Sequence, residues 1–419
     1  LKTRKNNTLI FFFSNNNMEN YDFSFKFATI PTIHFGVRKI SMLEEIIPTF
    51  GKRILLVRGK KSLVKSIKWH EIQEMFRSMN LAWSEISVEN EPTPKLINES
   101  VDAYRDANID AIVSIGGGSV LDAGKAISAM MLYDDPVEGF LEGVGSKKHD
   151  GRKIPFIACP TTSGTGSEAT KNAVIRRVGR NGFKKSLRHD NLIPNFAIID
   201  PEFVMTCPSN LTGACGMDAF TQLLESYVST SANPMTDALA FSGLKHMIKN
   251  LVPAATDKAN DIETRTGVAY GALISGITLA NAGLGVVHGF ASAVGGLFDV
   301  PHGVVCGTLM AEGNKTTIDI LRNQKEGPRR KLALMKYAEI GALMDGEVLR
   351  SSSMETINKY CDILIDRLET MQQQLGLKKF GHYGVKEEDI NLILTRAGNK
   401  NNPASLNKDQ MRELLKNRI

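Results

Sequence analysis

The sequence has few cysteines and no cysteine motif. They stand far apart along 419 residues without a CxxC pair, at Cys159, Cys207, Cys215, Cys306 and Cys361. This spacing excludes a disulfide framework and a cysteine-based zinc knuckle. We therefore expect a protein of a reduced compartment, the cytoplasm.

Long apolar runs and a strong charge imbalance are also missing. No stretch reaches the roughly 20 uncharged apolar residues that a transmembrane helix needs. The 51 basic and 45 acidic residues give a net charge of +6 without a long basic run, so nucleic acid binding is not indicated. The 42% of hydrophobic residues exclude disorder, and the length predicts two or three domains.

The first seventeen residues differ from the rest of the chain. They combine a basic start, a short apolar run and three asparagines, and the first methionine is Met18. A signal peptide needs a longer apolar core and a small-residue cleavage site. We interpret residues 1–17 as a non-native or disordered leader and exclude them from the fold prediction.

The remaining sequence divides into two parts near residue 201. Short apolar runs at 53–57, 111–115, 154–158 and 196–200 predict buried strands, and helical spacing at 62–79 and 94–107 separates them. Beyond residue 201 helical patterns dominate, with breaks at 283–285 and 300–303, over 211–231, 234–251, 262–283, 329–344, 353–375 and 408–419. We predict an α/β domain at 18–201 with a mostly parallel sheet, followed by an all-α domain at 202–419.

A glycine-rich turn follows the strand predicted at 111–115. Gly116, Gly117 and Gly118 precede Ser119 and Asp122, where an amphipathic stretch begins. Three glycines allow peptide N–H groups to approach a phosphate at a helix N-terminus. The turn is not the GxGxxG of the Rossmann fold, so a purely structural strand-to-helix turn stays an alternative.

A second polar loop, Cys159-Pro-Thr-Thr-Ser-Gly-Thr-Gly-Ser-Glu168, follows the strand predicted at 154–158. Thr161, Thr162 and Thr165 can hydrogen-bond a phosphate, a ribose or an amide. A surface loop would have the same composition. Two such loops after two strands, however, indicate one nucleotide lying across the strand ends.

One acidic residue and two histidines form a third group. Asp218 and Gln222 share a helix face because they are four residues apart, and His288 and His302 each precede a glycine. A single histidine is more often structural than a ligand. An acid with two histidines, by contrast, suits a divalent metal.

The order GGGSxxDxxK, PTTSGTGSE, GMDA, VHG and PHG resembles the iron-containing (group III) alcohol dehydrogenase family, which has the dehydroquinate synthase-like fold. The resemblance runs from about residue 33 to beyond residue 314. It implies a Rossmann-like domain that binds NAD or NADP, an all-helical domain that holds Fe²⁺ or Zn²⁺, and an active-site cleft between them. The metal would act as a Lewis acid in hydride transfer between an alcohol or aldehyde and nicotinamide. Because relatives are commonly dimers or larger, we expect a homodimer or higher homo-oligomer.

The resemblance also assigns roles to single residues. Asp218, His288 and His302 match catalytic positions, and with Gln222 they match the four metal ligands. The positions that match cofactor-binding residues are Gly116, Gly117, Gly118, Ser119, Asp122, Thr161, Thr162, Thr165, Asn172 and Lys184.

Two positions depart from the family pattern. Gln222 stands where the second metal ligand is usually histidine, and Ser292 replaces a histidine close to the nicotinamide. An amide oxygen is a weaker donor than imidazole for iron or zinc. Two alternatives therefore stay open: a reductase of an activated carbonyl with a weakened metal site or none, similar to maleylacetate reductases, and a catalytically silent nucleotide-binding protein.

Cofactor choice depends on Gly59, Lys60 and Lys61, which follow the strand predicted at 53–57. NAD-preferring relatives often have an aspartate at the position of Gly59. The missing carboxylate and the adjacent lysines favour the 2′-phosphate of NADP over NAD. Two solvated surface lysines are the alternative interpretation.

Overall fold

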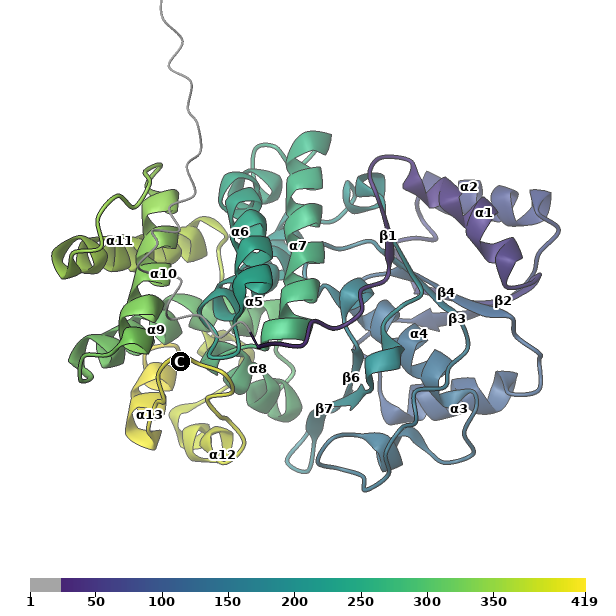
Figure 1. The fold of residues 1–419 in the computed structure, drawn as a ribbon. Coiled ribbons are helices and arrows are strands. Elements are labelled where there is room, and N and C mark those ends of the chain that lie inside the picture. The colour runs from purple at the N-terminus through teal and green to yellow at the C-terminus, as the bar shows by residue number, and fades with distance from the viewer. Residues whose placement is uncertain (1–23) are drawn as a thin grey trace, which may run out of the picture.

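The computed structural model describes residues 24–419, and the leader predicted at 1–17 lies outside them. The N-terminal part is built on a six-stranded sheet, and the C-terminal part consists of helices (Figure 1). The predicted fold class is therefore confirmed. The last sheet strand ends at Ile199 and the first long helix begins at Ser209.

All strand pairings in the sheet are parallel, in the order β1-β8-β5-β4-β2-β3. The bounds are β1 Thr32–Phe35, β2 Arg53–Gly59, β3 Ala82–Val88, β4 Ala111–Gly116, β5 Phe156–Pro160 and β8 Phe196–Ile199. The four predicted strands are present, with ends shifted by one or two residues. The prediction missed β1, β3 and the antiparallel pair β6 (Asn172–Arg177) and β7 (Phe183–Arg188).

Helices cover both faces of the sheet because its central strands are buried on both sides. Along β2, Leu55 and Val57 point to one hydrophobic cluster and Ile54 and Leu56 to another. Helices α3 (Pro94–Tyr104) and α4 (Gly118–Met130) pack on the first face, and α1 (Leu43–Ile46) and α2 (Ile67–Ser78) pack on the second. This two-sided burial explains the continuous apolar runs in the sequence.

The strand order reverses next to β2. The chain passes from β2 outward to β3 and then returns to place β4 on the other side of β2. In open α/β sheets such a reversal creates a crevice at the carboxyl ends of the two strands, where ligands bind. Gly59 and Gly116 end these two strands.

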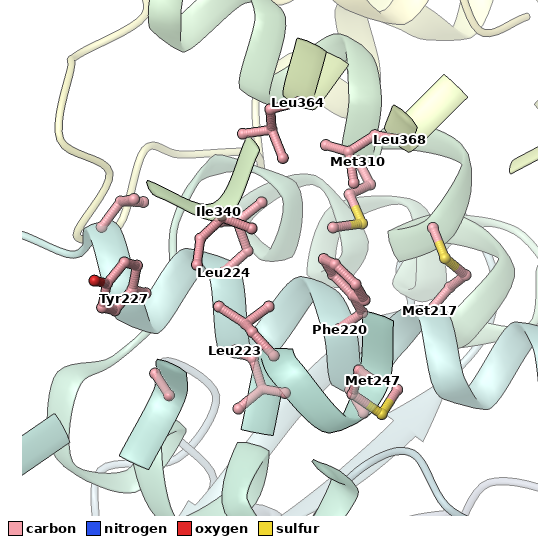
Figure 2. Packing of buried hydrophobic residues seen from close by; sticks show 14 of the residues in the cluster. Met217, Phe220, Leu223, Leu224, Tyr227, Met247, Met310, Ile340, Leu364 and Leu368 are labelled. Carbon is pink, nitrogen blue, oxygen red and sulfur yellow. The ribbon is translucent and has the colours of Figure 1, made fainter. Parts of the chain in front are cut away.

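The C-terminal part packs around α5, whose residues from Gly216 to Val228 are all buried. Phe220 and Leu223 of α5 contact a core that includes Met247 and Met310 (Figure 2). The helices are α5 Ser209–Val228, α6 Pro234–Ala255, α7 Ile262–Ala282, α8 Val286–Leu297, α9 His302–Asn323, α10 Pro328–Met344, α11 Met354–Gln374, α12 Ile390–Leu394 and α13 Lys408–Lys416. The prediction missed α8, α9 and the short α12, although it placed the breaks that precede α8 and α9. Within residues 24–419 no single helix is long and apolar enough to cross a membrane; only α7 and α8 together reach that length, and they meet at 99°.

Candidate active site

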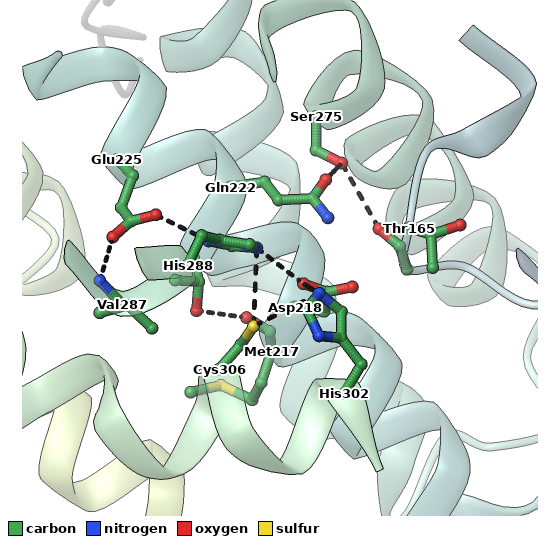
Figure 3. Close-up of polar contacts among 12 residues, drawn as sticks. Thr165, Met217, Asp218, Gln222, Glu225, Ser275, Val287, His288, His302 and Cys306 are labelled. Carbon is green, nitrogen blue, oxygen red and sulfur yellow. Dashed lines mark hydrogen bonds and ion pairs between the residues drawn. The ribbon is translucent and has the colours of Figure 1, made fainter. Parts of the chain in front are cut away.

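Four donor side chains from three helices meet at one point in the helical part. Asp218 lies in the middle of α5, His288 in the first turn of α8, and His302 is the first residue of α9. Cys306, one turn further along α9, completes the group (Figure 3). One ligand atom from each residue lies within 4.8 Å of the other three.

The distances within this four-residue cluster are short. His288 Nε2 is 3.2 Å and His302 Nε2 is 3.7 Å from Asp218 Oδ1. Cys306 Sγ lies 3.5 Å from His288 Nε2 and 3.8 Å from His302 Nε2. The structure thus brings together three of the four predicted metal ligands, and adds a cysteine that the prediction missed. The sequence signal that could have revealed Cys306 is its position four residues after His302, which places both side chains on one face of a helix.

Glu225 fixes the orientation of the His288 ring by contacting the ring nitrogen that faces away from the cluster. Its Oε2 is 2.7 Å from His288 Nδ1, and its Oε1 accepts a 2.7 Å hydrogen bond from Val287 N–H. Because Nδ1 is engaged, Nε2 is directed at the cluster. Carboxylates of this kind commonly fix the ring of a metal-ligating histidine. The helix predicted at 211–231 contains both Asp218 and Glu225, but the sequence prediction assigned no role to Glu225.

The charges in the cluster depend on one another. Burial would raise the pKa of Asp218, but the imidazoles of His302 and His288 outweigh it and hold that pKa well below its usual range. Burial disfavours a charged His288, yet Cys306, Glu225 and Asp218 raise its pKa well above normal. Burial and Lys184 lower the pKa of His302 to about 3, and burial raises that of Cys306 to about 11.

These residues fit a divalent metal ion. The cluster offers a carboxylate, two imidazoles and a thiol, the donor types that bind iron and zinc. His302 Nδ1 is buried without a hydrogen-bond partner among the described residues, so the ring is not held by an ordinary polar contact on that side. Asp218, His288 and Cys306 are almost completely buried, and buried charged groups are usually paired or coordinate a metal.

The two positions that depart from the family pattern face other groups. Gln222 Oε1, the predicted ligand atom, lies 2.8 Å from the hydroxyl of Ser275 on α7 (Figure 3). Ser292 donates a 3.1 Å hydrogen bond to the carbonyl oxygen of His288, as serine often does one turn along a helix.

A pocket of about 910 Å³, part of it open to solvent, runs from this cluster to the α/β part. Three residues of the four-residue cluster, Asp218, His288 and His302, line one side of the pocket. The predicted cofactor residues that line it are Gly118, Ser119, Asp122, Thr165, Asn172 and Lys184. Gln222 and Ser292 also line it.

The predicted residues Gly116, Gly117, Thr161 and Thr162 do not line the pocket; they shape the turn that borders it. Gly117 is the N-cap of α4 and offers no side-chain acceptor, so the first N–H groups of the helix, at the pocket residues Gly118 and Ser119, have no side-chain cap. A Cβ on Gly118 would lie 2.5 Å from Thr165 Oγ1. Only glycine lets the turn and the threonine-rich loop approach so closely.

Asp122 holds the pocket wall together. Its Oδ2 accepts a 3.0 Å hydrogen bond from Val174 N–H of β6, and its Oδ1 is hydrogen-bonded to Ser167. Burial raises the pKa of this carboxyl. Lys184 of β7 contributes a cation to the same wall and pairs with Glu91 at 2.8 Å.

Gly59, Lys60 and Lys61 lie outside this pocket. The two lysine Nζ atoms each lie 2.7 Å from a different oxygen of Glu89, just beyond β3. The lysines lower the pKa of Glu89 to about 2 by hydrogen bonding and charge. The charge predicted to attract a 2′-phosphate is therefore shared with a carboxylate that the sequence prediction had not considered.

Comparisons with known proteins extend over both parts of the chain. Residues 31–201 match the family described as iron-containing alcohol dehydrogenase, and residues 212–419 match its C-terminal family. The NAD-dependent methanol dehydrogenase of Bacillus methanolicus is 29% identical, over 88% of this chain and 95% of its own length. The NADPH-dependent butanol dehydrogenase of Clostridium saccharobutylicum is 27% identical, over 92% and 96% respectively. The crystal structure of a 1,3-propanediol oxidoreductase superposes with a TM-score of 0.83 at 27% identity, and covers 94% of this chain and 100% of its own.

Proposed function

The chain belongs to the iron-containing alcohol dehydrogenase family and is an NAD(P)-dependent oxidoreductase acting on CH–OH groups. We propose that it interconverts small alcohols and aldehydes at the Asp218–His288–His302 centre. The relatives named above act on methanol and butanol, which makes a short primary alcohol the first substrate to test.

The convergence of Asp218, His288 and His302 at one end of the cofactor pocket carries this proposal. A divalent cation held by these side chains would polarise the substrate oxygen as a Lewis acid. The pKa of Asp218 is held far below neutrality, so its carboxylate stays negative and available to a cation at physiological pH.

The other residues position the cofactor. The N-terminus of α4 at Gly118 and Ser119 would hold the pyrophosphate through backbone N–H groups and the helix dipole. Thr165, Asn172 and Lys184 line the pocket between this turn and the cluster, where the nicotinamide would lie. A bound NAD(P)H would supply hydride to the carbon of an aldehyde, whose oxygen would take up one proton.

We assign that proton to solvent, since the pocket is partly open. Asp218 stays ionised and cannot donate it, and the hydroxyl of Ser292 is hydrogen-bonded to the His288 carbonyl. A histidine at position 292 would be a better proton carrier near neutral pH. We therefore expect a slower protonation step than in relatives that have the histidine.

NADPH is the cofactor that we favour, since Gly59 leaves room for a 2′-phosphate and Lys60 and Lys61 supply positive charge. A Cβ at Gly59 would have only Ser62 Oγ nearby, at 3.6 Å, so the backbone there does not crowd a ribose. Lys60 and Lys61 would exchange part of their contact with Glu89 for the phosphate.

The test is NAD(P)H turnover with a panel of aldehydes and alcohols, together with metal analysis of the purified protein. Asp218→Ala should lose the metal and all turnover. The control Asp257→Ala, at an exposed position in the turn after α6, should keep both. Turnover that persists after complete chelation would favour the metal-independent reductase. Absence of both turnover and nucleotide binding would contradict the enzyme assignment and leave the silent protein.

A further inference from the structure

Cys306 occupies the place of a ligand in the four-residue cluster, although no part of the sequence pattern assigns it a role. We propose that its sulfur is the fourth protein ligand and that the centre is an Asp218–His288–His302–Cys306 site for a thiophilic divalent cation, zinc. The inference rests on the proposed function, since it concerns the metal of that same site.

The separations of the four donors match four corners of a zinc centre, to which a substrate oxygen would add as a fifth ligand. Zinc bonds of about 2.0–2.3 Å at tetrahedral angles place neighbouring donors roughly 3.3–3.8 Å apart. The structure gives 3.2 and 3.7 Å from Asp218 Oδ1 to the two Nε2 atoms, and 3.5 and 3.8 Å from Cys306 Sγ to the same two atoms. Four edges of the tetrahedron are therefore already near their final lengths, without movement of any helix.

Hydrogen bonding alone accounts for this arrangement poorly. Sγ lies within 4 Å of both imidazole Nε2 atoms, but a thiol has a single proton to donate. His288 already uses Nδ1 for Glu225, and His302 Nδ1 has no partner among the described residues. A cation at the centre would satisfy all four inward-facing atoms at once.

Gln222 is the competing ligand, and its geometry is less favourable. It follows Asp218 by one turn of α5, as Cys306 follows His302 by one turn of α9. The Gln222 amide oxygen, however, lies 2.8 Å from the Ser275 hydroxyl, whereas the sulfur of Cys306 points into the cluster (Figure 3). The missing histidine of α5 is thus compensated by a soft donor from α9.

A sulfur ligand changes which metal the site prefers. Thiolates favour zinc over manganese or magnesium, and add one negative charge to that of Asp218. When the sulfur–metal bond forms, the S–H proton passes to solvent, and no oxidant or reductant is needed.

The experiment uses cobalt as a spectroscopic probe for the full-length protein. Cobalt bound by a thiolate gives a sulfur-to-metal charge-transfer band in the near ultraviolet, and nitrogen and oxygen ligands alone do not. We compare the wild type, Cys306→Ser and, as a matched control, Cys215→Ser, which removes a thiol three residues before Asp218 on α5. Zinc affinity is measured in parallel by competition with a chromophoric chelator.

We expect the charge-transfer band in the wild type and in Cys215→Ser, and its loss in Cys306→Ser. Zinc affinity should fall by more than about 100-fold in Cys306→Ser and stay unchanged in Cys215→Ser. X-ray absorption of the zinc-loaded wild type, which needs no variant, should show one sulfur at about 2.3 Å. A wild type that binds cobalt and reduces aldehydes but shows neither band nor sulfur neighbour overturns this inference and leaves the proposed function intact. A wild type that binds no metal and turns over no substrate overturns both.

Discussion

Glu225 and His288 form a buried pair, with Glu225 Oε2 2.7 Å from His288 Nδ1. Glu225 stands two helical turns after Asp218, so α5 carries both a ligand and the group that orients another ligand. The remaining oxygen of Glu225 accepts from Val287 N–H at 2.7 Å and ties the start of α8 to α5. The direction of His288 Nε2 is therefore set by the fold, before any metal arrives.

Glu225→Gln should weaken the metal site while it keeps the side-chain volume. A glutamine amide has only one oxygen, so its NH₂ group must face either Val287 N–H or His288 Nδ1. One of the two contacts made by the Glu225 oxygens is therefore lost. Loss of such an outer contact typically lowers metal affinity by about 10- to 100-fold. Chelator competition measures this, with Glu339→Gln, at a half-buried glutamate hydrogen-bonded to Tyr227, as the control. Equal affinity in both variants would contradict the role given to Glu225.

Glu89→Gln should improve NADPH binding. The substitution releases Lys60 and Lys61 from their shared carboxylate and leaves their charge to the 2′-phosphate. Because exposed ion pairs are weak, we expect the KM for NADPH to fall only about two- to fivefold, with the KM for NADH unchanged. Glu74→Gln, at an exposed glutamate paired with Arg77, is the control.

Gly59→Asp tests the same crevice in the opposite sense. The added carboxylate would repel a 2′-phosphate, so the KM for NADPH should rise by about tenfold or more while NADH is little affected. A wild type that already prefers NADH tenfold would show that the lysines stay with Glu89.

Gly276→Ala should loosen the loop that borders the cofactor pocket. A Cβ at Gly276 of α7 would lie 2.2 Å from Gly166 O, and Gly166 itself has a φ of +62° that few other residues adopt. Overpacking of this kind costs about 1–3 kcal/mol. We expect a lower Tm and a higher KM for NADPH, since Thr165 and Ser167 line the pocket. Gly398→Ala, where a Cβ meets nothing within 4 Å, should change neither.

The sequence was most informative where burial is uniform or where a motif is contiguous. The apolar runs of β2, β4, β5 and β8 predicted their strands because both sides of each are covered. By contrast, β3 is half-exposed and carries Trp83 and Glu85, so its pattern is not that of a buried strand. The helix α8 was missed although the predicted breaks at 283–285 and 300–303 flank it; its glycines weaken a helical pattern, and at Gly289 a Cβ would meet Gly398 O at 1.8 Å.

The contributions of Cys306, Glu225 and Glu89 required three-dimensional information. Cys306 belongs to no cysteine motif, and helix spacing relates it to His302 but not to His288 and Asp218, which lie 18 and 88 positions away. Glu89 acts on Lys60 only because β2 and β3 are neighbours in the sheet. Sequence spacing reports neighbours on one helix, but not which helices meet.

Glu168 makes the stability of the protein depend on pH. It closes the threonine-rich loop and is almost completely buried, and burial raises its pKa to about 7 from an ordinary value of 4.5, against a smaller opposing effect of Lys125. The folded protein therefore holds this proton more tightly than the unfolded chain. The contribution of a protonated Glu168 is fully present below about pH 4.5 and is lost as the pH rises through about 7.

Glu168→Gln removes this dependence because the amide is neutral at every pH. A difference of about 2.5 pKa units corresponds to about 3 kcal/mol, so the variant should gain roughly that much stability over the wild type between pH 4.5 and pH 8. Urea unfolding at pH 5, 6, 7 and 8 measures the difference between the two proteins. If the difference is the same at all four pH values, Glu168 is ionised in the folded state throughout, and Lys125 compensates its charge despite the burial.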